Sequence, residues 1–175
     1  MEPFDLHTEP AERLLERLSD ANEWMRRQAV LEMGWRGLKG LESALKARLS
    51  AKDNLHAFDA LCALDLTGSL DERTHVGAIS HPDPYVRRWA VRLAAGASAG
   101  VMRAVVERAS VETHLEVLSQ MAATAKGFAA LDALEVLAAL VGTEDERIGF
   151  QLWWLLESFS ERAREDVLGL FGRSA

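Results

Sequence analysis

A pattern of helix-forming segments recurs along this chain about every 31 residues. Five such segments begin at nearly equal intervals, at Met25, His56, Val86, Val117 and Ile148. A repeat of this length is typical of stacked helical hairpins, because one hairpin is too small to bury its own apolar face and uses its neighbours as core. The repeat therefore predicts an array of hairpins.

The composition agrees with an all-helical chain. Ala, Leu, Glu and Arg dominate, whereas Tyr, Thr and Ile are sparse, and only four prolines occur among 175 residues. Strong helix formers in this proportion favour α-helix over strand. A hydrophobic fraction of 49% is high enough for a well-packed core. We therefore expect a single domain that spans residues 1–175.

Each expected hairpin has a first helix, named A, and a second helix, named B. The five positions above open the B helices, and amphipathic segments between them predict the A helices. The predicted A helices run about Ala11–Leu18, Leu38–Leu49, Glu72–Ile79, Val101–Ala109, Phe128–Val141 and Glu161–Phe171. The predicted units span approximately 8–36, 37–67, 68–97, 98–126 and 127–159, and a capping helix follows over 160–175.

Local signals mark the ends of these helices. The segments 69–72 and 143–146 have the Ser/Thr-x-x-Glu pattern of a capping box, in which the hydroxyl and the carboxylate bind exposed amides of the first turn. Pro82 and Pro84 lie in the third A–B break, where a missing amide costs little. Four glycines follow B segments, where a left-handed residue ends a helix easily: Gly34, Gly37, Gly68 and Gly96.

Two segments resemble a known repeat family. Residues 80–93 (SHPDPYVRRWAVRL) have an acid in the turn, then Val-Arg, then Ala three residues after that arginine, and residues 19–30 (SDANEWMRRQAV) are similar. This pattern resembles the HEAT repeat in its short bacterial form, the form also met in phycobilisome-lyase-like proteins. The resemblance implies a right-handed α-solenoid of about five HEAT-like hairpins plus a closing C-terminal helix.

In such repeats, the turn acid and the first arginine resemble a ladder that ties neighbouring hairpins together. The expected ladder residues are Asn22, Arg26, Asp53, Asp83 and Arg87. A carboxylate beside an arginine forms a charge-assisted bond, often with two contacts, that can fix the angle between hairpins. We expect Asp83 to be the partner of Arg87.

The second arginines predict a binding surface. Tyr85, Arg88 and Arg92 are spaced i, i+3 and i+7 and so share one face of a B helix. The repeat puts Trp24 and Arg27 at equivalent positions of the first hairpin and Phe58 at one of the second; in HEAT-like arrays, B helices line the concave side. Aromatic residues mixed with arginine are typical of protein-binding hot spots. The alternative is that some of these aromatics pack between hairpins.

The segment Ile148–Leu156 is apolar nearly all round because it contains two adjacent tryptophans. A helix of this kind is buried on every side or covered by a partner. Terminal repeats need a capping element. We therefore expect the closing helix to cover it.

Charge and reactive residues narrow the possible functions. The net charge of −7 gives no global basic field for nucleic acid. Cys62 is the only cysteine and lies in an apolar stretch, and the five histidines show no zinc-ligand spacing. We expect no metal and no cofactor. No stretch is apolar enough for a secretion signal or a membrane span, which favours the cytoplasm.

These observations favour a non-catalytic scaffold that binds a partner protein on its concave B-helix face. The alternative is a HEAT-like enzyme on nucleic acid, of the type that excises alkylated bases from DNA, because arginines and tryptophans can line such a surface. A phosphate-tracking groove needs positive charge along most of its length, which this stripe lacks. A lyase-type chaperone subunit for a tetrapyrrole rests on the repeat resemblance alone.

Overall fold

The chain is helical throughout the part that the computed structural model describes, which is residues 5–51, 56–143, 145–160 and 163–172. These ranges contain eleven α-helices, two 3-10 turns and no strand, which confirms the predicted all-α class. The α-helices are α1 (Ala11–Arg17), α2 (Glu23–Trp35), α3 (Glu42–Ser50), α4 (Ala57–Leu66), α5 (Glu72–Ile79), α6 (Pro84–Leu93), α7 (Ala99–Ala109), α8 (Leu115–Ala125), α9 (Ala130–Leu140), α10 (Glu146–Ser160) and α11 (Arg164–Gly172). They follow the predicted order of A and B helices.

The chain forms two compact units, residues 1–74 and 75–175, and the boundary falls inside α5. In unit 1, α2 packs against α1 and α4, and α4 also packs against α3. Leu14, Met33, Leu45 and Leu61 are fully buried there, one from each helix. The apolar spacing that predicted these helices therefore builds the core of this unit.

A polar segment covers one side of unit 1. The 3-10 turn Leu6–Thr8 packs on α2 and places Nδ1 of His7 2.8 Å from the buried carboxylate of Glu32. Arg36 donates to the carbonyl oxygen of Glu9 at 2.7 Å. Side-chain hydrogen bonds therefore help to hold the segment before α1 in place.

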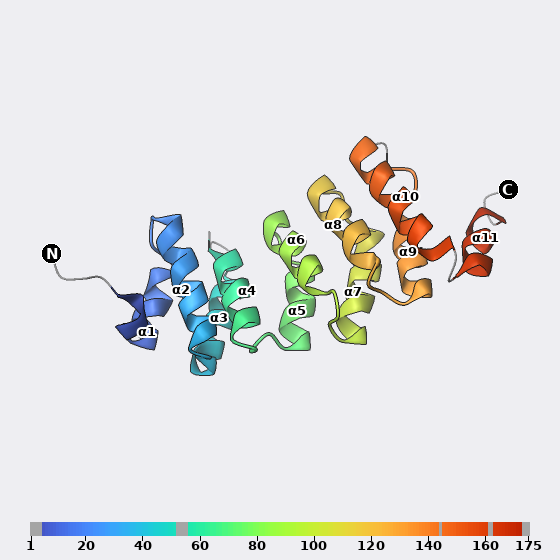
Figure 1. Ribbon diagram of the computed structural model, residues 1–175. Coiled ribbons are helices and arrows are strands. Elements are labelled where there is room, and N and C mark those ends of the chain that lie inside the picture. The colour runs from blue at the N-terminus through green and yellow to red at the C-terminus, as the bar shows by residue number, and fades with distance from the viewer. Residues whose placement is uncertain (1–4, 52–55, 144, 161–162, 173–175) are drawn as a thin grey trace. The chain divides into compact units, whose positions relative to one another are not determined.

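Unit 2 has a layer of A helices and a layer of B helices. The B helices α6, α8 and α10 pack side by side in that order, and so do the A helices α7, α9 and α11 (Figure 1). Val105, Met121, Leu140 and Leu155 are fully buried in this unit. At its start, Nε2 of the buried His75 in α5 lies 2.8 Å from the carbonyl oxygen of Ala90 in α6.

The helix ends agree with the predicted breaks, but two caps differ. Thr74 donates its amide to Asp71 at the start of α5, and Arg147 donates its amide to Asp145 at the start of α10. The capping-box interpretation of Ser69 and Thr143 is therefore wrong. Each aspartate lies closer to the first helical residue and offers a charged acceptor.

Three of the four predicted glycine terminators have positive φ, namely Gly37, Gly68 and Gly96. Gly34 instead lies inside α2. A Cβ on Gly34 would stand 2.8 Å from the Cβ of Leu66 at the end of α4. Glycine is needed here for close approach of two helices rather than for a turn.

We expect Gly34→Ala to lower the free energy of unfolding by about 1–2 kcal/mol, because overpacking exceeds the gain in helix propensity. Thermal unfolding followed by circular dichroism measures the effect. Gly77→Ala in α5 is the matched control, since nothing lies within 4 Å of the added Cβ. A Gly34→Ala variant as stable as the Gly77→Ala variant would contradict the close-approach argument.

Candidate functional site

The predicted binding residues of unit 2 lie on α6, and their side chains are at least partly exposed. Asp83 accepts a hydrogen bond from the amide of Tyr85, and Pro84 occupies the first turn, so the helix begins two residues before the predicted start at Val86. Tyr85 and Arg92 are exposed and Arg88 is half-buried. The guanidinium of Arg92 lies 5.0 Å from the ring centre of Trp89, within cation–π range.

A chain of charges runs across the three B helices of unit 2. Arg88 of α6 lies 3.4 Å from Glu116 of α8, and Glu116 lies 3.7 Å from Arg147 of α10. Arg147 also pairs with Asp145 at 3.0 Å and lowers the pKa of that carboxyl. The side chains of these ion pairs are mostly solvent-exposed, so each pair adds little to stability. Their effect is to alternate the sign of charge across the surface.

The predicted binding residues of unit 1 lie on α2 and α4. Trp24 is 57% exposed, and Arg27 is exposed beside Glu23 on the same helix. Phe58 of α4 is half-buried. The inference that these residues share one continuous face with those of α6 stays a prediction.

The predicted ladder arginine Arg87 is buried and joins two hairpins of unit 2. Its Nε and one terminal nitrogen donate to both carboxylate oxygens of Glu112 at 2.7 and 2.8 Å. The other nitrogen donates to the carbonyl oxygens of His81 and Pro82, both at 2.9 Å. Asp83 caps α6 instead, so its expected pairing with Arg87 is not what the structure has.

The Glu112 side chain is fully buried and has several further donors. Arg108 donates to it at 3.0 Å, and the amides of Thr113 and His114 also point at it. Burial raises the pKa of Glu112, but hydrogen bonds from Arg87, His114, Arg108 and Thr113 outweigh this and lower it to about 2. The carboxylate is held in its charged form.

Arg26 makes the corresponding bridge in unit 1. Its Nε donates to Asp59 of α4 at 3.0 Å, and a terminal nitrogen donates to the carbonyl oxygen of Asp20 at 2.9 Å. Asn22 caps α2 and does not reach Arg26 through its side chain in any hydrogen bond of the described ranges. The predicted ladder residue Asp53 lies outside the described residues. Burial raises the pKa of Asp59 despite the hydrogen bond from Arg26.

Sequence reasoning missed the two carboxylates of these bridges, Asp59 and Glu112. The HEAT-like pattern predicts the acid in the turn immediately before each B helix, where unit four has His114. The structure places Glu112 two residues earlier and Asp59 inside a B helix. A useful signal was available, because each is an acid within an otherwise apolar or small-residue stretch of the hairpin that follows its arginine.

The aromatic residues of α10 are exposed, contrary to the expectation that the closing helix covers them. Phe150, Trp153 and Trp154 are 71%, 58% and 57% exposed, and they line a shallow depression of about 690 Å³ with Glu146 and Gly149. The buried side of this helix carries Ile148, Leu155 and Phe159 instead. The helix α11 packs on the A-layer helix α9 and on α10 without covering the aromatics.

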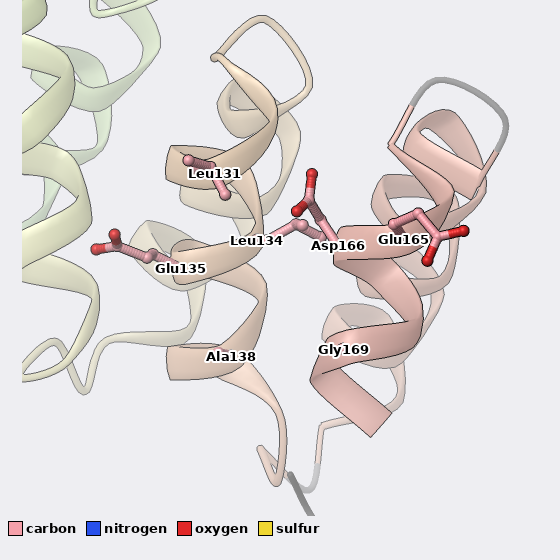
Figure 2. Close-up of a pocket in the computed structure, with 7 residues that line it drawn as sticks. All are labelled: Leu131, Leu134, Glu135, Ala138, Glu165, Asp166 and Gly169. Carbon is pink, nitrogen blue, oxygen red and sulfur yellow. The ribbon is translucent and has the colours of Figure 1, made fainter. Parts of the chain in front are cut away.

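A second hollow of about 440 Å³ lies between α9 and α11. In Figure 2, Leu134 and Asp166 lie between the two helices, whereas Glu135 and Glu165 point away. Glu135 is held by Arg103 at 2.8 Å. One carboxylate therefore faces an apolar wall, which supplies neither an acid–base pair nor a metal site.

Comparison with protein-family models, curated proteins and solved structures finds no match for this chain.

Reactive groups are few in the described part of the chain. Cys62 is mostly buried, and burial is the main reason that its pKa rises to about 12, so its thiol is a poor nucleophile at neutral pH. In the same ranges, no cluster of three or more histidine, cysteine or acidic residues could hold a metal ion. No helix there is both long enough and apolar enough to cross a membrane.

Proposed function

We propose that this protein is a non-catalytic scaffold of HEAT-like hairpins that binds a partner protein on its B-helix face. The observation that carries the proposal is the surface of unit 2, where Tyr85, Arg88 and Arg92 lie on α6 with Phe150 and Trp154 on α10. The helix between them, α8, packs against both. The few residues that supply most of the binding energy of protein interfaces are enriched in Trp, Tyr and Arg.

The charges on this surface favour a protein over nucleic acid. Glu116 lies between Arg88 and Arg147 and partly neutralises both. A surface of alternating sign suits a protein segment that carries both charges, whereas a nucleic-acid strand requires a run of positive charge. The cation–π contact of Arg92 with Trp89 holds that arginine near an aromatic surface, where it can pair with a carboxylate.

The test is an affinity capture from an extract of the source cells, with the immobilised full chain as bait. We expect Arg88→Ala with Arg92→Ala to lose the protein that the natural chain retains, with an affinity loss of about 1–4 kcal/mol. Both arginines are at least partly exposed, so circular dichroism should show unchanged folding.

Arg73→Ala with Arg103→Ala is the matched control, because it removes two exposed arginines from the A helices α5 and α7. The control should retain the same protein as the natural chain. Loss of capture in the control but not in the α6 variant would place binding on the A helices. Retention of short duplex DNA at physiological salt, weakening steeply as salt is added, would contradict a protein-binding role.

A further inference from the structure

The aromatic face of α10 has a defined composition along its length. Phe150 and Trp153 are flanked by Glu146 and Glu157 at spacings of i, i+4, i+7 and i+11, which lie on one side of a helix. All four side chains are exposed. The face is therefore an aromatic strip with a carboxylate at each end.

The equivalent side of the other B helices in unit 2 shows what covers this side of α10 in the repeat. On α6, Arg87 reaches Glu112 in the next hairpin, so that side of α6 turns toward the hairpin that follows. Val91, one turn further along, is fully buried. The same side of α8 carries Leu118 and Ala122, which are also buried, and α10 packs against α8. In α6 and α8, this side is part of the interface between hairpins.

The equivalent positions on α10 are Gly149 and Trp153. Trp153 is 58% exposed, and no helix of the described residues covers this side of α10. Gly149 has open space where a Cβ would stand, so another backbone can approach the helix closely there. This face of α10 is therefore equivalent to the faces of α6 and α8 that pack on the next hairpin. It is apolar, and it has room for one more helix.

The two carboxylates at the ends of the strip, Glu146 and Glu157, determine which kind of helix can bind there. Two copies of α10 packed antiparallel about a two-fold axis would bring Glu146 of one copy near Glu157 of the other, and like charges repel. The same carboxylates would repel an anionic lipid surface. A helix with basic residues at both ends of an aliphatic strip would pair with both acids and cover the aromatics.

We propose that α10 is the docking site for an amphipathic helix of a partner protein, with an aliphatic strip that packs on Phe150 and Trp153 and a Lys or Arg at each end that pairs with Glu146 and Glu157. This inference rests on the proposed protein-binding role and specifies one partner chemistry for it. The docking site shares Phe150 with the surface proposed above but does not include the arginines of α6.

The experiment uses two synthetic helical peptides with the same leucine strip. One has lysines at the two positions, eleven residues apart, that would face the acids, and the other has glutamates there. Titration is followed by calorimetry with the full chain. We expect the lysine peptide to bind at least about tenfold more tightly than the glutamate peptide.

Matched variants make the test specific. Trp153→Ala should lower the affinity for the lysine peptide at least about tenfold. Trp35→Ala, which removes an exposed tryptophan of α2, should leave that affinity unchanged. Glu146→Lys with Glu157→Lys should reverse the preference between the peptides. Replacement of two other exposed acids by lysine, Glu12→Lys with Glu107→Lys, should leave the preference between the peptides unchanged.

Three results would overturn the docking site. They are equal affinity for the two peptides, a lysine-peptide affinity that Trp153→Ala does not change, and a dimer in sedimentation that Trp153→Ala abolishes. Failure here would leave the proposed function standing if the variant with both Arg88 and Arg92 replaced still loses its captured protein. Failure of both experiments would reject the scaffold role as well.

Discussion

Replacement of Arg87 by alanine should lower the free energy of unfolding of unit 2 by about 3–4 kcal/mol, because it leaves a buried carboxylate without its main partner. Glu112 would keep only Arg108 and two backbone amides, and the carbonyl groups of His81 and Pro82 would lose their shared donor. Urea unfolding monitored by circular dichroism measures the loss.

Arg88→Ala is the control for that experiment, since it removes the neighbouring arginine, whose ion pair with Glu116 is exposed. We expect it to cost at most about 1 kcal/mol. A double replacement, Arg87→Met with Glu112→Leu, removes both charges and should recover much of the loss. Equal stability of the Arg87→Ala and Arg88→Ala variants would show that the buried bridge does not stabilise the unit.

Acid should destabilise unit 2 through Glu112. The pKa of Glu112 is about 2 in the folded chain, below the ordinary value near 4.3 for glutamate, so the unfolded chain binds more protons between these values. The contribution is complete above about pH 5 and is lost as the pH falls toward 2, and it amounts to about 3 kcal/mol. The measurement is the unfolding free energy in urea from pH 7 to pH 2.5.

The variant with both Arg87 and Glu112 replaced serves as the control, because its stability should change less between pH 5 and pH 2.5. Asp59 in unit 1 has the opposite effect on the pH dependence of stability. Its pKa is raised in the folded chain, so its contribution to stability falls as the pH rises through that value. An acid dependence that is equal in the natural chain and in the control would remove Glu112 as its cause.

The positions of the helices could be predicted because they depend on local spacing. The apolar period and the turn residues placed α5 at Glu72–Ile79 and the other helices within a few residues of their observed bounds. The capping residues were harder, since a hydroxyl and an aspartate competed at neighbouring positions. Asp71 prevails over Ser69 because it carries a charge and stands next to the first turn.

Contacts between hairpins could not be predicted, because they depend on how far a side chain reaches across the interface. Arg87 was expected to pair within its own turn, yet its side chain reaches Glu112, which is 25 residues away in sequence. Gly34 was predicted to end a helix and instead permits Leu66 to approach. The exposure of Trp153 was missed for the same reason, since it depends on where α11 packs.

The guanidinium of Arg87 also determines how unit 2 can come apart. It binds the carbonyl groups of its own turn and the carboxylate of the next hairpin together, so neither hairpin can open without leaving the other with unsatisfied polar groups. At the equivalent position, α8 carries Leu118 and α10 carries Gly149, and neither side chain can form a buried bridge of this kind. The ion pairs Arg103–Glu135 and Arg147–Glu116, which join the hairpin of α9 and α10 to the preceding one, are exposed and so add little to stability. Partial unfolding should therefore begin at this last hairpin, which can detach as a separate cooperative segment while α6 and α8 remain folded.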